Sequence, residues 1–133
     1  MRLLIDTNII LDVLFEREGL FEESKAVLKL CETGKIDGYI TASSLTDLFY
    51  IIKKHLHSTE KTYDVLGQIL NIVKILPVTT EDVNKAFLRR EKDFEDTLQA
   101  TCALTNKCEG IVTRNVKDFE RMGLKILTPG ETK

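Results

Sequence analysis

Short runs of apolar residues alternate along this chain with longer segments in which apolar residues recur every three or four positions. The short runs have the length of buried β-strands, and the longer segments have the period of amphipathic helices. The pattern predicts strands at 3–5, 39–42, 111–113 and 124–127, with 75–78 as a short strand or an extended link. It predicts helices at 9–15, 21–33, 45–57, 60–73, 81–90, 96–106 and 116–122.

Strands that alternate with helices are typical of a parallel sheet that is covered on both faces. The expected fold class is therefore α/β, with a central, mainly parallel sheet of four or five strands. The chain has 133 residues, no repeat and no linker-like segment. That length is typical of one globular unit, so we expect a single domain over residues 1–133.

Polar residues mark where several of these helices should begin. Side chains that commonly cap helix N-termini stand before three of the helical segments. The candidate caps are Asp6 or Thr7, Ser43 or Ser44, and Thr80.

Composition narrows the classes of protein that remain. Apolar residues make up 43% and charged residues 30% of the chain, as in ordinary folded proteins. A formal charge of −2 argues against a protein that coats nucleic-acid duplexes. The three cysteines include no Cys-x-x-Cys pair, which argues against a disulfide framework or a zinc knuckle. With no secretory signal and no long apolar stretch, we expect a soluble, cytoplasmic protein without membrane contact.

Acidic and amide side chains follow the predicted strands where those strands end. Asp6 ends the first strand, Asp47 lies one turn into the helix after the second, and Asn115 and Asp118 follow strand 111–113. Asp96 opens the helix that leads into that strand. The carboxyl ends of parallel strands meet at one edge of a sheet, where ligands bind in such folds. We therefore expect these five side chains to face one crevice.

Carboxylates that gather in one crevice repel each other and raise their pKa values unless a cation neutralises them. Oxygen ligands of this kind suit Mg²⁺ or Mn²⁺ rather than zinc. A metal held in this way can activate water and stabilise charge on a phosphate during in-line attack. The chain has no nucleophile elbow, Walker loop or dinucleotide-binding glycine motif that would favour other chemistry.

Three blocks of the sequence resemble the PIN domain family. They are residues 4–12 (LIDTNIILD), 93–100 (DFEDTLQA) and 111–119 (IVTRNVKDF), and they follow the family's order and spacing. The resemblance implies a three-layer α/β/α sandwich and an Mg²⁺- or Mn²⁺-dependent endoribonuclease that leaves a 3′-hydroxyl and a 5′-phosphate. Many short bacterial PIN domains are toxins of the VapC type, so the resemblance also implies an RNA substrate, a small antitoxin partner and a homodimer.

The same motifs assign roles to individual residues. Asp6, Asp96 and Asp118 match family acids and are the expected metal ligands. Asp47 lies where the family usually has glutamate, and its shorter side chain changes the reach of that catalytic acid. Asn115 lies where many members have aspartate, and it keeps an oxygen but not the charge. Thr7, Asn8, Thr113 and Asn115 are the expected substrate-positioning residues.

Simpler interpretations exist for each acid. Asp6 and Asp118 could serve only as helix caps, and Asp47 could be a solvated position on its helix. Asp93 is expected at the surface, and the role of Glu95 is left undecided. Basic residues near these motifs form either a rim that guides phosphates or an ordinary solvated surface; they are Arg89, Arg90, Lys92, Arg114 and Lys117.

Two other functions compete with the nuclease. A phospho-acceptor receiver domain also has an acidic pocket at a sheet edge, but the predicted strand at 39–42 ends without the aspartate that it would need. The other alternative is a PIN-like module that binds RNA or protein with little or no cleavage. The residues at Asp47 and Asn115 keep this second alternative open.

Overall fold

The computed structural model describes residues 1–132, which form a five-stranded sheet in the order β3-β2-β1-β4-β5. All neighbouring strands run parallel. The strands are β1 (Arg2–Ile5), β2 (Asp37–Thr41), β3 (Lys74–Leu76), β4 (Gly110–Val112) and β5 (Lys125–Leu127). The helices are α1 (Thr7–Leu14), α2 (Phe21–Glu32), α3 (Ala42–Leu56), α4 (Thr59–Leu70), α5 (Thr80–Arg89), α6 (Phe94–Thr105) and α7 (Val116–Phe119), followed by the 3₁₀ turn η1 (Pro129–Thr132). The predicted α/β class is confirmed, and of segment 75–78, Ile75 and Leu76 belong to strand β3.

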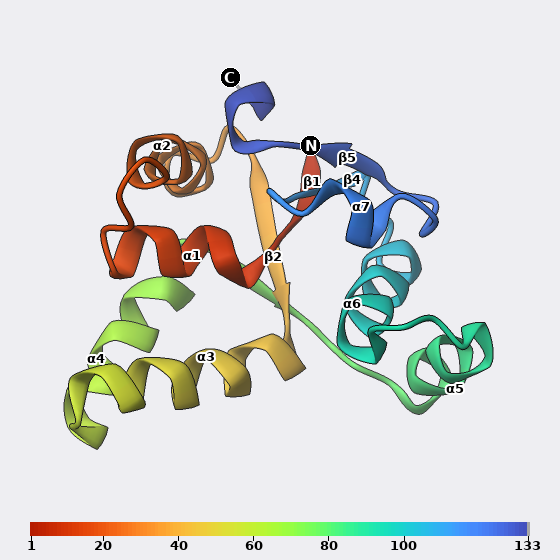
Figure 1. Ribbon diagram of the computed structural model, residues 1–133, viewed down its shortest axis with the longest axis horizontal. Helices are drawn as coiled ribbons and strands as arrows, with labels where there is room; N and C mark the ends of the chain where they lie inside the picture. The colour runs from red at the N-terminus through yellow and green to blue at the C-terminus, as the bar shows by residue number, and fades with distance from the viewer. Residues whose placement is uncertain (133) are drawn as a thin grey trace.

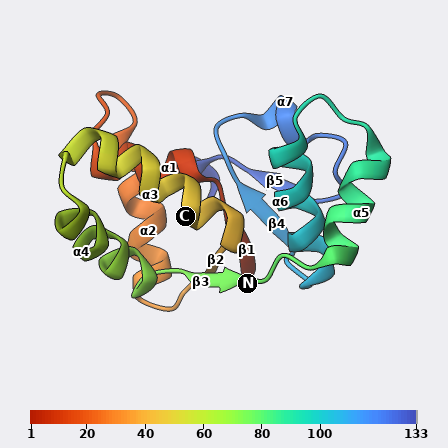
Figure 2. The same cartoon turned by 90° about the horizontal axis from the view of Figure 1, so that it is seen from below.

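Helices cover the sheet on both faces, as Figures 1 and 2 show. Helices α1 to α4 lie on one side, while α6 and α7 lie on the other and α5 packs against α6. Strand β1 divides its side chains between these layers: Leu3 and Ile5 join the core under α1 to α4, and Leu4 joins the core under α6 and α7. An apolar strand with both faces buried belongs in the middle of a parallel sheet. Among residues 1–132, no helix has the length and hydropathy needed to cross a bilayer.

Two predicted helix caps are wrong by one to three positions. Thr41, the last residue of β2, caps α3 by accepting a hydrogen bond from the Ser44 amide at 3.1 Å. Thr79, rather than Thr80, caps α5 and forms a reciprocal capping box with Asp82. In both cases an earlier threonine has extended backbone and reaches the third amide of the helix. Helix α3 therefore begins directly after β2, and residues 43–44, which lay between the predicted strand and helix, belong to the helix.

Other predicted boundaries shift by a few residues. Helix α6 begins two residues before Asp96, because Asp93 caps it by accepting from the Asp96 amide at 2.9 Å. Helix α7 ends at Phe119 rather than 122, and the 3₁₀ turn after Thr128 was not predicted. The earlier start of α6 places Glu95 and Asp96 together in its first turn.

The three cysteines are free and buried. Burial, followed by the charge of Asp37, raises the pKa of the Cys31 thiol to about 11. Burial, followed by the charge of Asp82, raises the pKa of the Cys102 thiol to about 12. These thiols stay protonated near neutral pH and act as small apolar side chains.

The close approach of β4 to β5 requires glycine at position 110. A Cβ atom added there would collide with the carbonyl oxygen of Lys125, its partner on β5. We expect Gly110→Ala to lower the free energy of unfolding by about 3 kcal/mol, because a backbone atom cannot move aside as a flexible side chain would. Urea denaturation measures the change.

Gly67 in α4 provides a matched control for the same substitution. A Cβ there meets nothing within 4 Å, so Gly67→Ala should stabilise the helix by about 0.5–1 kcal/mol. Equal effects of the two alanines would contradict the steric explanation for Gly110.

Candidate functional site

Asp6 stands at the carboxyl end of β1 and is held on two sides. Its side chain is nearly buried, with 5% exposed. One carboxylate oxygen accepts from the Asn8 amide at 3.4 Å and caps α1, while the other accepts from the Thr113 hydroxyl at 2.7 Å. The Thr113 hydroxyl also accepts from the Asn115 amide at 3.0 Å. The cap and the contact across the sheet therefore occur together and fix the orientation of this carboxylate.

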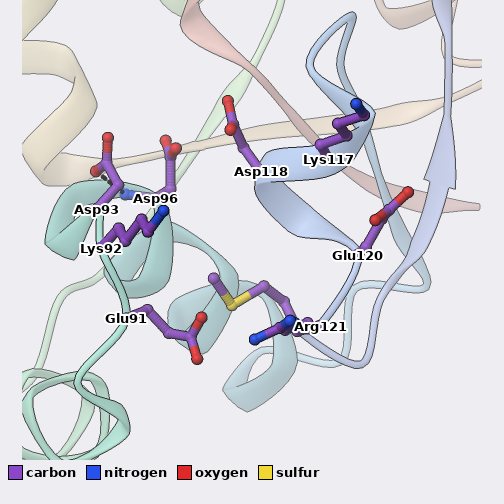
Figure 3. Close-up of a pocket in the computed structure, with 9 residues that line it drawn as sticks. Glu91, Lys92, Asp93, Asp96, Lys117, Asp118, Glu120 and Arg121 are labelled. Atoms are coloured by element: carbon purple, nitrogen blue, oxygen red, sulfur yellow. Dashed lines mark hydrogen bonds between the residues drawn. The ribbon is translucent and has the colours of Figure 1, made fainter.

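Asp96 lies where the charges of several acids converge. Burial raises the pKa of its carboxyl to about 7, and the charges of Asp93, Asp6, Asp118 and Glu95 act in the same direction. Figure 3 shows Asp96 in the first turn of α6 and Asp118 on α7 beside it. The structure thus brings Asp6, Asp96 and Asp118 into one region although they are separated by up to 112 positions in the chain.

Asp47 interacts with Glu95, which neighbours Asp96 on α6. Burial raises the pKa of Glu95, and the next causes are the charge of Asp47 and a hydrogen bond between the two carboxyl groups. Gln99, which is 1% exposed, donates from Nε2 to Glu95 at 3.4 Å one turn further along α6. Glu95, whose role the sequence left undecided, therefore lies with the predicted acids. We call Asp6, Asp47, Glu95, Asp96 and Asp118 the acidic group. Asp93 is exposed, as expected, but its charge also acts on Asp96.

A pocket of about 320 Å³ opens between the start of α6 and α7 (Figure 3). Acidic and basic side chains and one methionine line it: Glu91, Lys92, Asp93, Asp96, Lys117, Asp118, Glu120, Arg121 and Met122. Asp96 and Asp118 stand at one end, while Glu91 and Arg121 face each other further along (Figure 3). Arg89 holds the turn after α7 by donating to the Arg121 carbonyl at 2.7 Å. The pocket gives one flank of the acidic group access to solvent and to a ligand.

The four residues predicted to position substrate have different environments. Thr113 is buried and touches Asp6 directly. Asn115 is exposed and reaches Thr113 through its backbone amide. Asn8 accepts from the Arg17 guanidinium at 3.4 Å, and Thr7 is the first residue of α1. Within residues 1–132, Thr113 is the one of the four whose side chain bonds to a site acid.

The acidic group suits a divalent cation by its chemistry. The donors are carboxylate oxygens, and burial together with the charges of neighbouring acids raises the pKa values of Asp96 and Glu95. Within residues 1–132, however, no three His, Cys, Asp or Glu side chains are arranged tightly enough to form a ligand set.

The raised pKa of Asp96 has a consequence for stability. Because its folded-state pKa lies near 7 instead of the ordinary 3.8, the folded protein binds more protons than the unfolded chain between these values. Asp96 therefore lowers stability as pH rises from about 4 to about 7. In EDTA, we expect the melting temperature of the wild type to fall across this range and to fall less for Asp96→Asn. If the melting temperature depends on pH equally in the two proteins, the pKa of Asp96 is not raised.

A buried ion pair that sequence reasoning missed lies next to this site. The sequence left Arg114 either at a phosphate-guiding rim or on a solvated surface, but it donates to both oxygens of Asp12, from Nε at 2.9 Å and from Nη2 at 2.8 Å. Asp12 is completely buried. The signal was present in the sequence: an aspartate within the apolar run IILDVLF must find a partner if it is buried.

Comparisons with known proteins agree on one architecture. A model of the PIN domain family matches residues 2–117. VapBC2 from Rickettsia felis, bound to a promoter DNA fragment, is 19% identical with a TM-score of 0.73, covering 96% of this chain and 98% of that chain. A toxin-antitoxin complex from Klebsiella pneumoniae is 22% identical with a TM-score of 0.69, covering 96% and 97%. DNA-bound VapBC from Salmonella typhimurium is 19% identical with a TM-score of 0.72, covering 97% and 98%. The comparison with curated proteins gave no significant match.

Proposed function

Because the chain belongs to the PIN domain family, we propose that it is an Mg²⁺- or Mn²⁺-dependent endoribonuclease. The observation that carries the proposal is the position of Asp96, whose pKa is raised by burial and by four surrounding acids that include Asp6 and Asp118. Carboxylates gathered beside an open pocket provide the charge that a divalent cation neutralises. This arrangement favours a metal-assisted attack on phosphodiesters over the receiver-domain alternative.

Asp6, Asp96 and Asp118 would hold the cation, and Asp47 would support them. When bound, the cation supplies a Lewis acid that lowers the pKa of water and stabilises charge on a phosphate oxygen. Thr113 holds the Asp6 carboxylate in place through its hydroxyl. Burial and the charge of Asp47 raise the pKa of Glu95, so an ionised Glu95 would be the stronger base and could take up a proton from the attacking water. Thr7, Asn8 and Asn115 would contact the RNA at the mouth of the site.

We extend the proposal to a role in a toxin-antitoxin pair. The similar structures are described as VapBC or toxin-antitoxin complexes, and the likeness extends over 96–97% of this chain in the three cases above. In this proposal residues 1–133 form a single cytoplasmic nuclease domain that acts as a homodimer and is silenced by a small antitoxin protein. Co-expression of a short neighbouring reading frame, followed by purification of the complex, tests the partner.

A second candidate function is a PIN-like module that binds RNA or protein and cleaves weakly. The aspartate at position 47 supports it because this side chain is shorter than the family's usual glutamate, and Asn115 supports it because it brings no charge. Incubation of the purified protein with a 5′-labelled RNA pool, with Mn²⁺ or with EDTA, separates the two. The nuclease yields Mn²⁺-dependent fragments with 3′-hydroxyl ends. A binding module retards the RNA in a gel and leaves it intact in both conditions.

A further inference from the structure

A buried network centred on Asp12 lies outside the acidic group. The Asp12 carboxylate is completely buried. It accepts hydrogen bonds from side chains on α2 and in the connection between α1 and α2, and from a loop that is distant in the chain. Ser24 donates to it at 2.8 Å and Arg17 at 3.2 Å, while Arg114 donates through two nitrogens at 2.8 and 2.9 Å. A buried carboxylate is tolerated when it is paired and hydrogen-bonded in this way. The two-nitrogen contact with Arg114 joins two residues that are 102 positions apart in the chain.

Arg114 lies in the loop that carries the site residues after β4. Its neighbour Thr113 donates to Asp6, and its other neighbour, Asn115, donates its amide to Thr113. The Asn115 carbonyl in turn accepts from the Asp118 amide at 3.1 Å at the start of α7. A continuous series of short contacts thus runs from buried Asp12 to two of the proposed metal ligands.

The geometry of the contact restricts this loop more than a simple charge would. A guanidinium that donates two parallel bonds to a carboxylate is fixed in both position and plane, whereas a lysine ammonium is a flexible point charge. The contact also occupies the positive charge of Arg114. Because Asp12 is completely buried, this contact ties the residue between Thr113 and Asn115 to helix α1.

We propose that Asp12 and Arg114 are a positioning pair for the active site, in which the buried contact holds loop 113–118 so that Thr113 contacts Asp6 and Asp118 lies beside Asp96. This inference rests on the proposed function, because it assigns the loop to a metal site. The pair touches no reacting atom. Its effect is on the affinity of the site for the cation and on the order of the loop.

Variants of the two arginines that share Asp12 test the pair. Arg114→Ala and Arg114→Lys remove the two-nitrogen contact from the loop. Arg17→Ala is the matched control, because it also removes one guanidinium from Asp12 but leaves the loop contact intact. Each protein is titrated with Mn²⁺ alone by electron paramagnetic resonance. Hydrogen exchange is followed in loop 113–118 and in α5 as an internal reference.

Both Arg114 variants should bind Mn²⁺ about 10–100-fold more weakly than the wild type, as is typical when a group that orients metal ligands is lost. Their loop amides should exchange faster while α5 is unchanged, and Arg17→Ala should match the wild type. If Arg114→Ala matches Arg17→Ala in both measurements, the positioning role is wrong. Arg114→Lys keeps the charge and decides the matter should the alanine variant fail to fold.

The Mn²⁺ titration, read together with the RNA incubation described above, separates this inference from the proposed function. A wild type that binds Mn²⁺ but leaves RNA intact disproves the nuclease, and the affinity and exchange data still decide the role of the pair. A wild type that binds no Mn²⁺ disproves both.

Discussion

Replacing Asp96 by asparagine should reduce Mn²⁺-dependent RNA cleavage by about 10²–10³-fold or more, because one preorganised charge is lost where the cation and phosphate meet. Asparagine has nearly the same shape and keeps the backbone amide that bonds to Asp93. It also removes a carboxylate that Asp6, Asp118 and two other acids repel. The variant should therefore fold and be at least as stable as the wild type at neutral pH without metal. Initial rates on a labelled RNA and melting curves in EDTA measure the two effects.

Glu120 offers a control from the lining of the same pocket. Figure 3 shows its carboxylate directed away from Asp96 and Asp118, and it is not one of the charges that act on Asp96. Glu120→Gln removes one negative charge from the pocket and should cleave RNA near the wild-type rate. Unchanged cleavage by Asp96→Asn would remove Asp96 from the site. Equal losses in both variants would mean that total charge matters and the position of each acid does not.

Replacing Asp12 by alanine should lower the free energy of unfolding by about 3 kcal/mol, because it leaves the buried ends of two arginines without their acceptor. The Arg114 and Arg17 side chains are 28% and 34% exposed, so both guanidiniums can move partly into water. This places the expected loss at the lower end of the range for broken buried ion pairs. Chemical denaturation in EDTA at pH 7 measures it.

Asp37 supplies the matched control for Asp12. It pairs with Lys74 at 3.9 Å, and their side chains are 47% and 69% exposed. Exposed pairs of this kind contribute roughly 0–1 kcal/mol, so Asp37→Ala should change the stability little. A loss at Asp12 as small as that at Asp37 would show that the buried network does not stabilise the fold.

The pattern along the chain was sufficient to predict the layers of this protein. Leu3, Leu4 and Ile5 form a run with no polar face, which requires a strand that is buried on both sides, and the structure places it at the centre of the sheet. Asp6 directly after that run had to lie at the carboxyl edge. Helix period, strand length and the position of acids after strands are properties of neighbouring residues, so they can be read without coordinates.

Contacts between distant segments could not be predicted in the same way. The pattern places Asp47 and Glu95 each on a helix near one edge, but their hydrogen bond depends on how α3 and α6 pack against the sheet. The pairing of Asp12 with Arg114 likewise depends on where the loop after β4 crosses α1. Such contacts follow from the packing of whole elements, and a shift of one residue in strand register would break them.

The sequence by itself determined the fold class, and it predicted the edge at which the site lies and the acids expected there, because apolar period and strand ends are local signals. The tertiary structure decided which acid contacts which, that Glu95 belongs with them, and that Arg114 serves a buried carboxylate instead of a phosphate rim. These assignments depend on distances across the packed layers. Those distances are set only when the helices pack against the sheet.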